Sequence, residues 1–258
     1  MRVREALRDA EVRLAAAGVE TPRVDAEWLV AHALGATRSG VYARLDDEVE
    51  LDGLLERRAA REPLAYVLGE WGFRRLTLKT DARALVPRPE TEVVVERALA
   101  LLRGVEAPRV LDIGVGSGAI ALALKDERPD ASVVGVDVSE GALALARENA
   151  QRLGLDVELR EGDESAAGEG WDLVVSNPPY VDSLEGLQAE LHFEPRTALV
   201  GEDMHARIAA AAETRALVLE VGAGQAQDVA ALLRRCRYRQ VVVTPDLAGI
   251  ERVVEGLR

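Results

Sequence analysis

Apolar residues in the first part of the chain recur every three or four positions, which is the spacing of one helix face. Val3, Leu7, Ala10 and Leu14 are the clearest case. This pattern predicts an amphipathic helix at the amino terminus. No alternating stretch that would suggest a strand is found before residue 70, so we expect a small helical domain over residues 1–70.

Two further helices are predicted in the same region. Thr21-Pro22 places a typical capping residue before a proline at the first helical position, which favours a helix start there and a helix that runs to Gly35. A third helix is expected over residues 51–58, where leucines recur at helical spacing.

Between residues 71 and 90 the pattern changes to alternation. Phe73, Leu76 and Leu78, with the alternation in Arg75-Leu-Thr-Leu-Lys79, suggest a short strand or β-hairpin. The segment Val86-Pro-Arg-Pro-Glu-Thr-Glu92 follows, and its two prolines restrict the backbone. We expect residues 71–90 to form a β-hairpin linker between two domains.

From residue 91 onward, short apolar runs alternate with helical stretches such as Ala119–Glu127 and Glu140–Leu153. This alternation predicts an α/β fold with a parallel, doubly wound sheet and right-handed crossovers over residues 91–258. Six strands are predicted from the pattern: Arg109–Gly114, Ser132–Asp137, Asp156–Glu161, Trp171–Asn177, Ala216–Val221 and Gln240–Thr244.

The composition narrows the classes of function. The 258 residues are 48% hydrophobic, and 32 basic against 45 acidic residues give a net charge of −13, which disfavours nucleic-acid binding. The single cysteine, Cys236, and the three scattered histidines provide no set of metal ligands. No apolar run is long enough to span a membrane and no secretory segment is recognisable, so we expect a cytoplasmic protein.

A glycine-rich turn separates the first predicted strand of the α/β region from its helix. The turn comprises Gly114, Val115, Gly116, Ser117 and Gly118. Glycines let the backbone approach a ligand closely, and the helix start offers free N–H groups. A turn of this kind by itself is also compatible with a flexible loop that binds nothing.

Acidic residues follow the next two predicted strands. Asp137 ends its strand 23 residues after Gly114, where a carboxylate suits the ribose hydroxyls of a nucleoside cofactor. Asp163 ends the following strand, and its side chain is placed to face an adenine amino group, although a solvated loop acid fits as well. The Gly-x-Gly-x-Gly spacing differs from the Gly-x-Gly-x-x-Gly of nicotinamide cofactor sites.

The most informative motif is Asn177-Pro-Pro-Tyr180, directly after the strand that begins at Trp171. A carboxamide nitrogen is a poor nucleophile because its lone pair is delocalised. The Asn177 side-chain oxygen and the Pro178 carbonyl can each accept one N–H of a planar amino group, and the prolines make that carbonyl rigid. Tyr180 offers a face for the amide plane. The motif therefore indicates methyl transfer from S-adenosylmethionine to a planar nitrogen.

At this point the sequence resembles the release factor glutamine methyltransferases, the PrmC/HemK family, over nearly its whole length. The segments that carry the resemblance are Thr21-Pro-Arg-Val-Asp-Ala-Glu27, Glu62-Pro-Leu-Ala-Tyr66 with Gly69, Val86-Pro-Arg-Pro-Glu-Thr-Glu92, Leu111-Asp-Ile-Gly-Val-Gly-Ser-Gly-Ala-Ile120, Asn177-Pro-Pro-Tyr180 and Phe193-Glu-Pro-Arg-Thr-Ala-Leu199.

The resemblance implies a seven-stranded, Rossmann-like class I S-adenosylmethionine-dependent methyltransferase domain behind a helical substrate-recognition domain and a β-hairpin linker. It implies N5-methylation of the glutamine in the Gly-Gly-Gln motif of class I peptide-chain release factors, with S-adenosylhomocysteine as product. No metal is implied. The residues from Gly114 to Gly118, Asp137, Asp163, Glu164 and Asn177 correspond to cofactor-binding positions.

The same resemblance assigns substrate contacts. Asn177, Pro178 and Tyr180 are expected to be catalytic, and with Pro179 they would contact the substrate amide. Arg88, Pro89 and Glu92 would shape the roof of the cleft that receives it. We expect a monomer that binds a protein substrate, with no direct nucleic acid or membrane partner.

One departure from the family pattern and three rival functions remain open. Residues 202–215 are shorter than usual in the family and lack its Pro-Gly-Gly turn. The rivals are a glutamine methyltransferase that acts on a ribosomal protein, an adenine N6 DNA methyltransferase, which would need base flipping and a basic surface, and a catalytically silent binding module.

Overall fold

The computed structural model describes residues 1–181 and 183–258. The chain forms two compact units. The helical unit comprises Met1–Glu70 together with Leu187–Phe193, and the sheet unit comprises Trp71–Gly186 and Glu194–Arg258. The first boundary falls where the sequence pattern changes. The inclusion of Leu187–Phe193 in the helical unit was not anticipated from the sequence.

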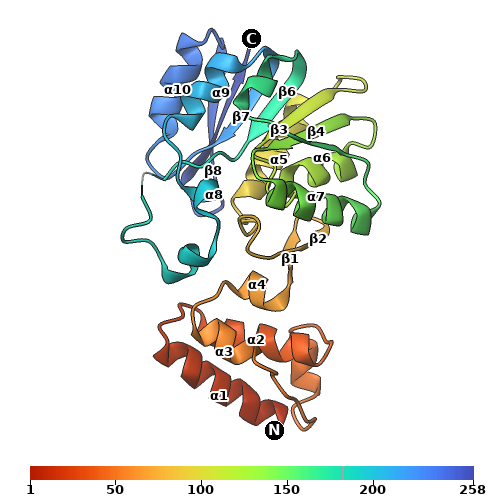
Figure 1. Cartoon of the computed structure of the whole chain (residues 1–258), viewed down its shortest axis with the longest axis vertical. Helices are drawn as coiled ribbons and strands as arrows, with labels where there is room; N and C mark the ends of the chain where they lie inside the picture. Colours follow the sequence, from red (N-terminus) through yellow and green to blue (C-terminus); the bar gives the residue numbers. More distant parts are fainter. Residues whose placement is uncertain (182) are drawn as a thin grey trace. The chain divides into compact units, whose positions relative to one another are not determined.

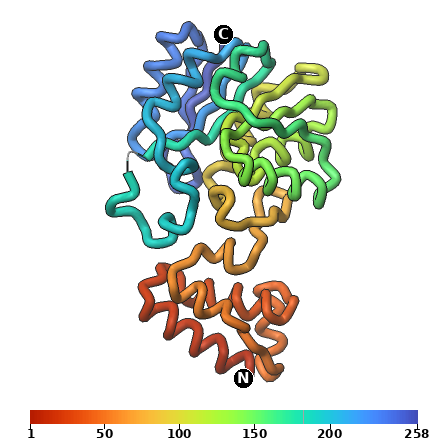
Figure 2. Tube along the Cα trace, in the orientation of Figure 1, coloured from red at the N-terminus to blue at the C-terminus, as the bar shows by residue number. Residues whose placement is uncertain are grey.

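The helical unit contains the helices that the apolar spacing predicted (Figure 2). The four residues of the first predicted stripe are all buried on α1. Proline stands at the start of α2 as expected, but the Thr21 side chain does not cap the helix. Its hydroxyl donates to Asp25 Oδ1 at 2.8 Å. The helices are α1 (Val3–Ala16), α2 (Pro22–Ala33), α3 (Leu54–Ala59) and α4 (Leu64–Leu68), with a 3-10 turn η1 (Gly40–Ala43).

A buried ion network explains why a distant segment belongs to the helical unit. The Arg58 guanidinium donates from Nε to Asp25 Oδ2 at 2.7 Å and from Nη2 to Glu190 Oε1 at 2.9 Å. Arg61 Nη2 donates to Glu190 Oε2 at 2.6 Å. Glu190 lies in the 3-10 turn η3 (Ala189–Phe193). Charge-assisted hydrogen bonds at these distances are strong, so they fix η3 to the helices.

The sheet unit is built on a seven-stranded sheet with the strand order β5-β4-β3-β6-β7-β9-β8. Figure 1 labels β3, β4, β6, β7 and β8 of this sheet. The strands are β3 (Arg109–Ile113), β4 (Ser132–Asp137), β5 (Glu158–Glu161), β6 (Trp171–Ser176), β7 (Thr214–Glu220), β8 (Gln240–Pro245) and β9 (Glu251–Leu257). The fold class expected from the family resemblance is therefore confirmed.

The expectation of a wholly parallel sheet was wrong at one edge. Strands β3 to β7 pair in parallel, but β9 runs antiparallel to both β7 and β8. The pattern had not predicted β9, since Glu251, Arg252 and Glu255 interrupt its apolar residues. Glu255 is nevertheless buried, and Arg97 Nε donates to its Oε2 at 2.6 Å, so the ion pair lets an acidic residue occupy a strand that is paired on both sides.

Helices cover both faces of the sheet, as the near-continuous apolar strands require. One face packs against α5 (Thr91–Leu101), α6 (Ala119–Glu127) and α7 (Glu140–Leu153). The other packs against α9 (Met204–Ala211), α10 (Ala226–Arg235) and the 3-10 turn η2 (Glu164–Gly168). Adjacent residues on β3 show the division, because Val110 joins the first core and Leu111 the second.

The predicted β-hairpin is present as β1 (Glu70–Phe73) and β2 (Leu76–Lys79). Its apolar residues Phe73, Leu76 and Leu78 belong to the same core as α5 and α6. The hairpin residues from Trp71 onward therefore belong to the same compact unit as the sheet. Within residues 1–181 and 183–258, none of the helices combines the length and apolar character needed to cross a membrane.

Candidate active site

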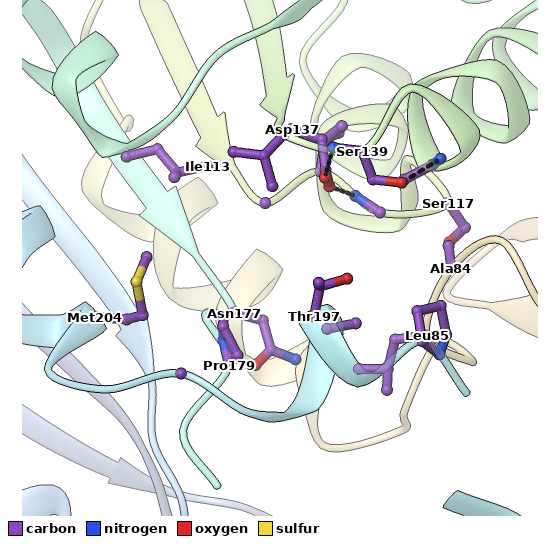
Figure 3. Close-up of a pocket in the computed structure, with 18 of the residues that line it drawn as sticks. Ala84, Leu85, Ile113, Ser117, Asp137, Ser139, Asn177, Pro179, Thr197 and Met204 are labelled. Atoms are coloured by element: carbon purple, nitrogen blue, oxygen red, sulfur yellow. Dashed lines mark hydrogen bonds between the residues drawn. The ribbon is translucent and has the colours of Figure 1, made fainter. Parts of the chain in front are cut away.

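A cavity of about 450 Å³ opens beside the carboxyl ends of β3, β4 and β6, where ligands bind in sheets of this type. Figure 3 shows Asp137 and Ser139 on one side of it and Asn177, Pro179 and Thr197 on the other. Ten of the residues expected at the site line the cavity: Arg88, Gly114, Val115, Gly116, Ser117, Asp137, Asp163, Glu164, Asn177 and Pro179. Gly118, Pro178, Tyr180 and Glu92 are not among its lining residues.

The glycine turn needs its glycines for two different reasons. At Gly114, with φ +73°, a Cβ atom would meet no heavy atom within 4 Å, so the backbone there faces open space in the cavity wall. At Gly118, with φ +88°, a Cβ atom would lie 2.8 Å from Leu122 Cδ1. Gly118 precedes α6 and supports the turn from behind rather than from within the cavity.

Asp137 is held by backbone donors on both sides. Its Oδ2 accepts the Gly116 N–H at 3.0 Å, and its Oδ1 accepts the Ser139 N–H at 2.9 Å. Each carboxylate oxygen has a second lone pair for a further donor. The residue that ends β4 therefore presents a fixed double acceptor to the cavity, directly beside the glycine turn.

A second carboxyl, at Asp112, lies beneath this turn, and sequence reasoning gave it no role. Its side chain is 1% exposed, Oδ2 accepts the Ala121 N–H at 3.1 Å, and Oδ1 has no hydrogen-bond partner in the described part of the chain. Burial raises the pKa of Asp112 to about 8, the Ala121 N–H opposes the rise, and the charge of Asp137 adds to it. At neutral pH this carboxyl is mostly protonated.

The acidic pair after β5 lines another part of the cavity. Asp163 Oδ1 accepts the Ser165 N–H at 2.9 Å, and the hydrogen bonds from Ser165 lower the pKa of Asp163. Glu164 forms an ion pair with Arg207 of α9. Both acids therefore have protein partners that fix their positions at the cavity wall.

Asn177 follows β6 and is oriented by residues that the sequence did not reveal. Its Nδ2 donates to Thr91 Oγ1 at 3.3 Å, and the Thr91 hydroxyl donates to Glu220 Oε2 at 2.6 Å. Pro179 lines the cavity and Pro178 is buried. The Tyr180 carbonyl accepts from Gln225 Nε2 at 3.1 Å, which fixes the end of the motif.

Two of the residues expected in the cleft roof, Arg88 and Glu92, differ in their placement. Arg88 lines the cavity and pairs with Glu194, whose Oε2 also accepts the Val86 N–H at 3.0 Å. Burial raises the pKa of Glu194, and the Arg88 charge opposes that rise. Glu92 instead accepts the Arg74 N–H at 2.8 Å in the hairpin turn. Its assignment as a substrate contact stays a prediction.

A mixed seven-stranded sheet, a glycine turn after β3 and an acid at the end of β4 define a class I S-adenosylmethionine-dependent methyltransferase. The release factor glutamine methyltransferase of Deinococcus radiodurans is 45% identical to this chain, covering 100% of it and 99% of the relative. The chain belongs to the release factor glutamine methyltransferase (PrmC) family.

Other comparisons agree with this assignment. The family description "PrmC N-terminal domain" matches residues 5–69, and "Methyltransferase small domain" matches residues 93–199. The release factor glutamine methyltransferase of Geobacter sulfurreducens is 42% identical, covering 94% of this chain and 92% of its own. The crystal structure of the hMettl16 catalytic domain has a TM-score of 0.56 at 15% identity, over 79% of this chain and 81% of that one, and shares the fold.

Proposed function

We propose that this protein transfers a methyl group from S-adenosylmethionine to the side-chain nitrogen of the glutamine in the Gly-Gly-Gln motif of class I peptide-chain release factors. The products are N5-methylglutamine and S-adenosylhomocysteine. The observation that supports this most is the placement of Asn177 in the same cavity as the glycine turn and Asp137. An amide acceptor and a nucleoside site therefore share one cavity, in a chain that belongs to this family.

The residues present fit the methyl donor. Gly114 leaves room for a ligand against the backbone, and Asp137 presents two fixed oxygens suited to ribose hydroxyls. Val115, Gly116, Ser117 and Gly118 complete the turn, and we assign Asp163 and Glu164, which also line the cavity, to the adenine. We assign the cofactor to these residues and to Asn177. No metal has a role in this assignment.

Bound S-adenosylmethionine supplies an electrophilic methyl group on a positively charged sulfur. The chain's own contribution is to hold the amide nitrogen in line with it. In our proposal Asn177 Oδ1 accepts one amide N–H and the Pro178 carbonyl accepts the other, which orients the nitrogen and favours localisation of its lone pair. Removal of one such acceptor is expected to lower kcat by roughly 10²–10³-fold.

Tyr180 contributes a neutral surface to this arrangement. Burial raises the pKa of Tyr180 to about 12, and the charge of Glu220 adds to that rise. The phenol therefore stays protonated at working pH, so it acts as a face for the substrate amide plane rather than as a base. No strong base is needed before attack, because the positive charge of the donor is lost as the methyl group moves.

The remaining assignments concern the protein substrate. Arg88, Glu92 and Pro179 are assigned to its contacts, residues 1–70 to its recognition, residues 71–90 to the linker and residues 91–258 to methyl transfer. We further propose a monomer that acts in the cytoplasm, where translation termination takes place. Neither nucleic acid nor a membrane is part of the proposed complex.

Mass spectrometry of purified class I release factors after incubation with the enzyme and S-adenosylmethionine tests the proposal. We expect a gain of one methyl group on the Gly-Gly-Gln glutamine, and none when that glutamine is replaced by alanine. Methylation of a ribosomal protein instead, or of adenine in DNA, would reassign the substrate. Cofactor binding without transfer to any of these would favour a silent binding module.

The variant Asn177→Ala tests the role of the amide acceptor. We expect it to lose nearly all transfer while its affinity for S-adenosylmethionine is reduced but measurable. Asn177→Asp is the matched control, since it keeps an acceptor oxygen at the same distance from the backbone and should retain more activity than the alanine variant. Unchanged turnover in Asn177→Ala would contradict the proposed grip.

A further inference from the structure

Three polar side chains form a row that leads away from the cavity. Asn177 follows β6, Thr91 begins α5 and Glu220 ends β7. Thr91 and Glu220 are 4% and 1% exposed. The bond from Asn177 Nδ2 to Thr91 Oγ1 is 3.3 Å long, and the bond from the Thr91 hydroxyl to Glu220 Oε2 is 2.6 Å long. The row connects the residue of the amide grip to a buried carboxyl.

The chemistry of these groups fixes the direction of both bonds. A carboxylate only accepts, and a threonine hydroxyl has one proton to donate. When Glu220 is ionised, the Thr91 proton is used in the bond to it, and Thr91 Oγ1 can only accept from Asn177. The Asn177 amide must then turn its NH2 group to Thr91. Its Oδ1 is left as the atom that accepts elsewhere, which is the atom that the amide grip needs.

An asparagine amide has nearly the same shape in its two flipped orientations. Without a directional partner, the flipped orientation would present an NH2 group to the substrate NH2 group, and two donors cannot bond. A hydroxyl that is free to rotate could bond either amide orientation, as acceptor of the NH2 group or as donor to Oδ1. The anionic carboxylate at the end of the row removes that freedom.

Several charged groups surround Glu220 and set its protonation. Burial raises the pKa of Glu220 to about 7, the Thr91 hydroxyl opposes the rise, Glu90 adds to it, and Arg252 and Arg88 oppose it. His205 Nε2 lies 2.7 Å from the Glu220 backbone oxygen, and burial lowers the pKa of that imidazole. Protonated Glu220 can donate its proton to Thr91, whose own proton is then free to bond Asn177 Oδ1.

We propose, on the basis of the function assigned above, that Glu220 and Thr91 are positioning residues that hold Asn177 with Oδ1 facing the reacting amide. Thr91 lines the cavity beside Asn177 and Glu220 does not, and in this assignment both residues act through Asn177 rather than on the reacting atoms. When Glu220 is ionised, the two hydrogen bonds fix the orientation of the Asn177 amide. When Glu220 is protonated, either orientation of that amide can be bonded by Thr91. Transfer should therefore rise with pH as Glu220 ionises, through a step in kcat that belongs to this carboxyl.

The test compares steady-state methylation of a release factor by the full-length wild type and Glu220→Gln between pH 5.5 and 9. A glutamine keeps the size of the side chain but offers Thr91 either an acceptor or a donor at every pH. We expect kcat of the variant at pH 8 to fall about tenfold, the loss of one directed hydrogen bond. The low-pH step of the wild type should disappear, with little change in KM or in cofactor affinity.

Thr91→Ser and Thr91→Val form a matched pair that distinguishes an orienting role of the Thr91 hydroxyl from an effect on folding. Serine keeps the hydroxyl and should restore most of the wild-type kcat and its pH step, whereas valine should resemble Glu220→Gln. Circular dichroism and S-adenosylmethionine affinity report on folding in each variant. If Thr91 had only a structural role, stability or cofactor binding would fall together with kcat in the valine variant. Serine would then not restore kcat selectively. That result would overturn the proposal.

The outcome is distinguishable from failure of the proposed function. If the wild type leaves the release factor unmethylated, the function itself is wrong. If the wild type is active and Glu220→Gln keeps both its kcat and its low-pH step, the function stands and the positioning role is refuted. A step that survives in Glu220→Gln would have its origin in another group, such as His205 or a group of the substrate.

Discussion

The buried carboxyl of Asp112 gives the sharpest stability prediction. It lies beneath the glycine turn at 1% exposure with one oxygen unpartnered among the described residues, and burial raises its pKa to about 8. The change Asp112→Asn keeps an acceptor for the Ala121 N–H and cannot ionise. The variant should therefore become more stable relative to the wild type as the pH rises from about 4 to 8.

The magnitude follows from the two states of the carboxyl. In the unfolded chain it ionises at its ordinary pKa of 3.8, whereas the folded protein keeps it protonated up to about pH 8. The folded state binds more protons in this window, so wild-type stability falls as the pH rises. At pH 7 the loss is about 4 kcal/mol, which is ~1.4 kcal/mol for each of the roughly 3.2 pH units above 3.8.

The pH dependence of the difference in unfolding free energy between variant and wild type is a better observable than its absolute value. The Asp112→Asn variant carries an NH2 group where the wild type has an unpartnered oxygen, and an unsatisfied buried donor costs about 1–3 kcal/mol. That cost is the same at every pH. It shifts the whole difference curve without changing its slope, which depends on the wild-type carboxyl alone.

Chemical denaturation of both proteins at pH 5.5, 6.5 and 7.5 measures the effect. Unfolding is followed by tryptophan fluorescence, to which Trp71 and Trp171 contribute from the sheet unit and Trp28 from the helical unit. The difference in unfolding free energy should grow by about 1.4 kcal/mol per pH unit in favour of the variant. Asp156→Asn, at an exposed position, controls for the loss of one negative charge. Parallel curves for wild type and Asp112→Asn would refute the reasoning.

Three other changes have defined outcomes. Asp137→Ala removes both fixed oxygens beside the glycine turn and should weaken S-adenosylmethionine binding at least tenfold in calorimetry, with no effect if the ribose binds elsewhere. In Gly118→Ala the new Cβ atom, at φ +88°, would lie 2.8 Å from the buried Leu122 Cδ1. In Gly154→Ala, at φ +66°, the new Cβ atom would have no heavy atom within 4 Å. The first should therefore lower thermal stability by clearly more than the roughly 1–2 kcal/mol of the second. Arg58→Ala leaves the buried Asp25 carboxylate without its cation, whereas Glu190 keeps its ion pair with Arg61. The change should destabilise the helical unit by about 3–5 kcal/mol in denaturant titration, and a loss below about 1 kcal/mol would contradict the network.

Local pattern was sufficient for much of the fold. The bounds of α6 and α7 were predicted to the residue, since each helix lies between a clear start and a clear end in the sequence. The strands that precede the glycine turn and Asn177 were placed to within one residue, because their apolar runs are buried on both faces. Secondary structure of this kind depends on neighbours that are close in the chain.

Elements with mixed or short patterns were missed for physical reasons. The strand β9 carries charged residues that become acceptable only because Arg97, far away in sequence, pairs with Glu255. The helix α4 has only five residues, little more than one turn, and shows no repeat. In both cases tertiary packing stabilises the element, and the residues that pack against it are not part of the local sequence pattern.

The sequence by itself determined which chemistry the protein has: a glycine turn, an acid after the next strand and an amide acceptor between a strand and two prolines. Only the tertiary structure decided how these groups are supported. Thr91 and Glu220 lie 129 positions apart and meet because α5 packs on β7, Glu92 turns to the hairpin, and Leu187–Phe193 joins the helical unit through Glu190. Hydrogen bonds between distant residues follow from strand order and packing, which periodicity along the chain does not encode.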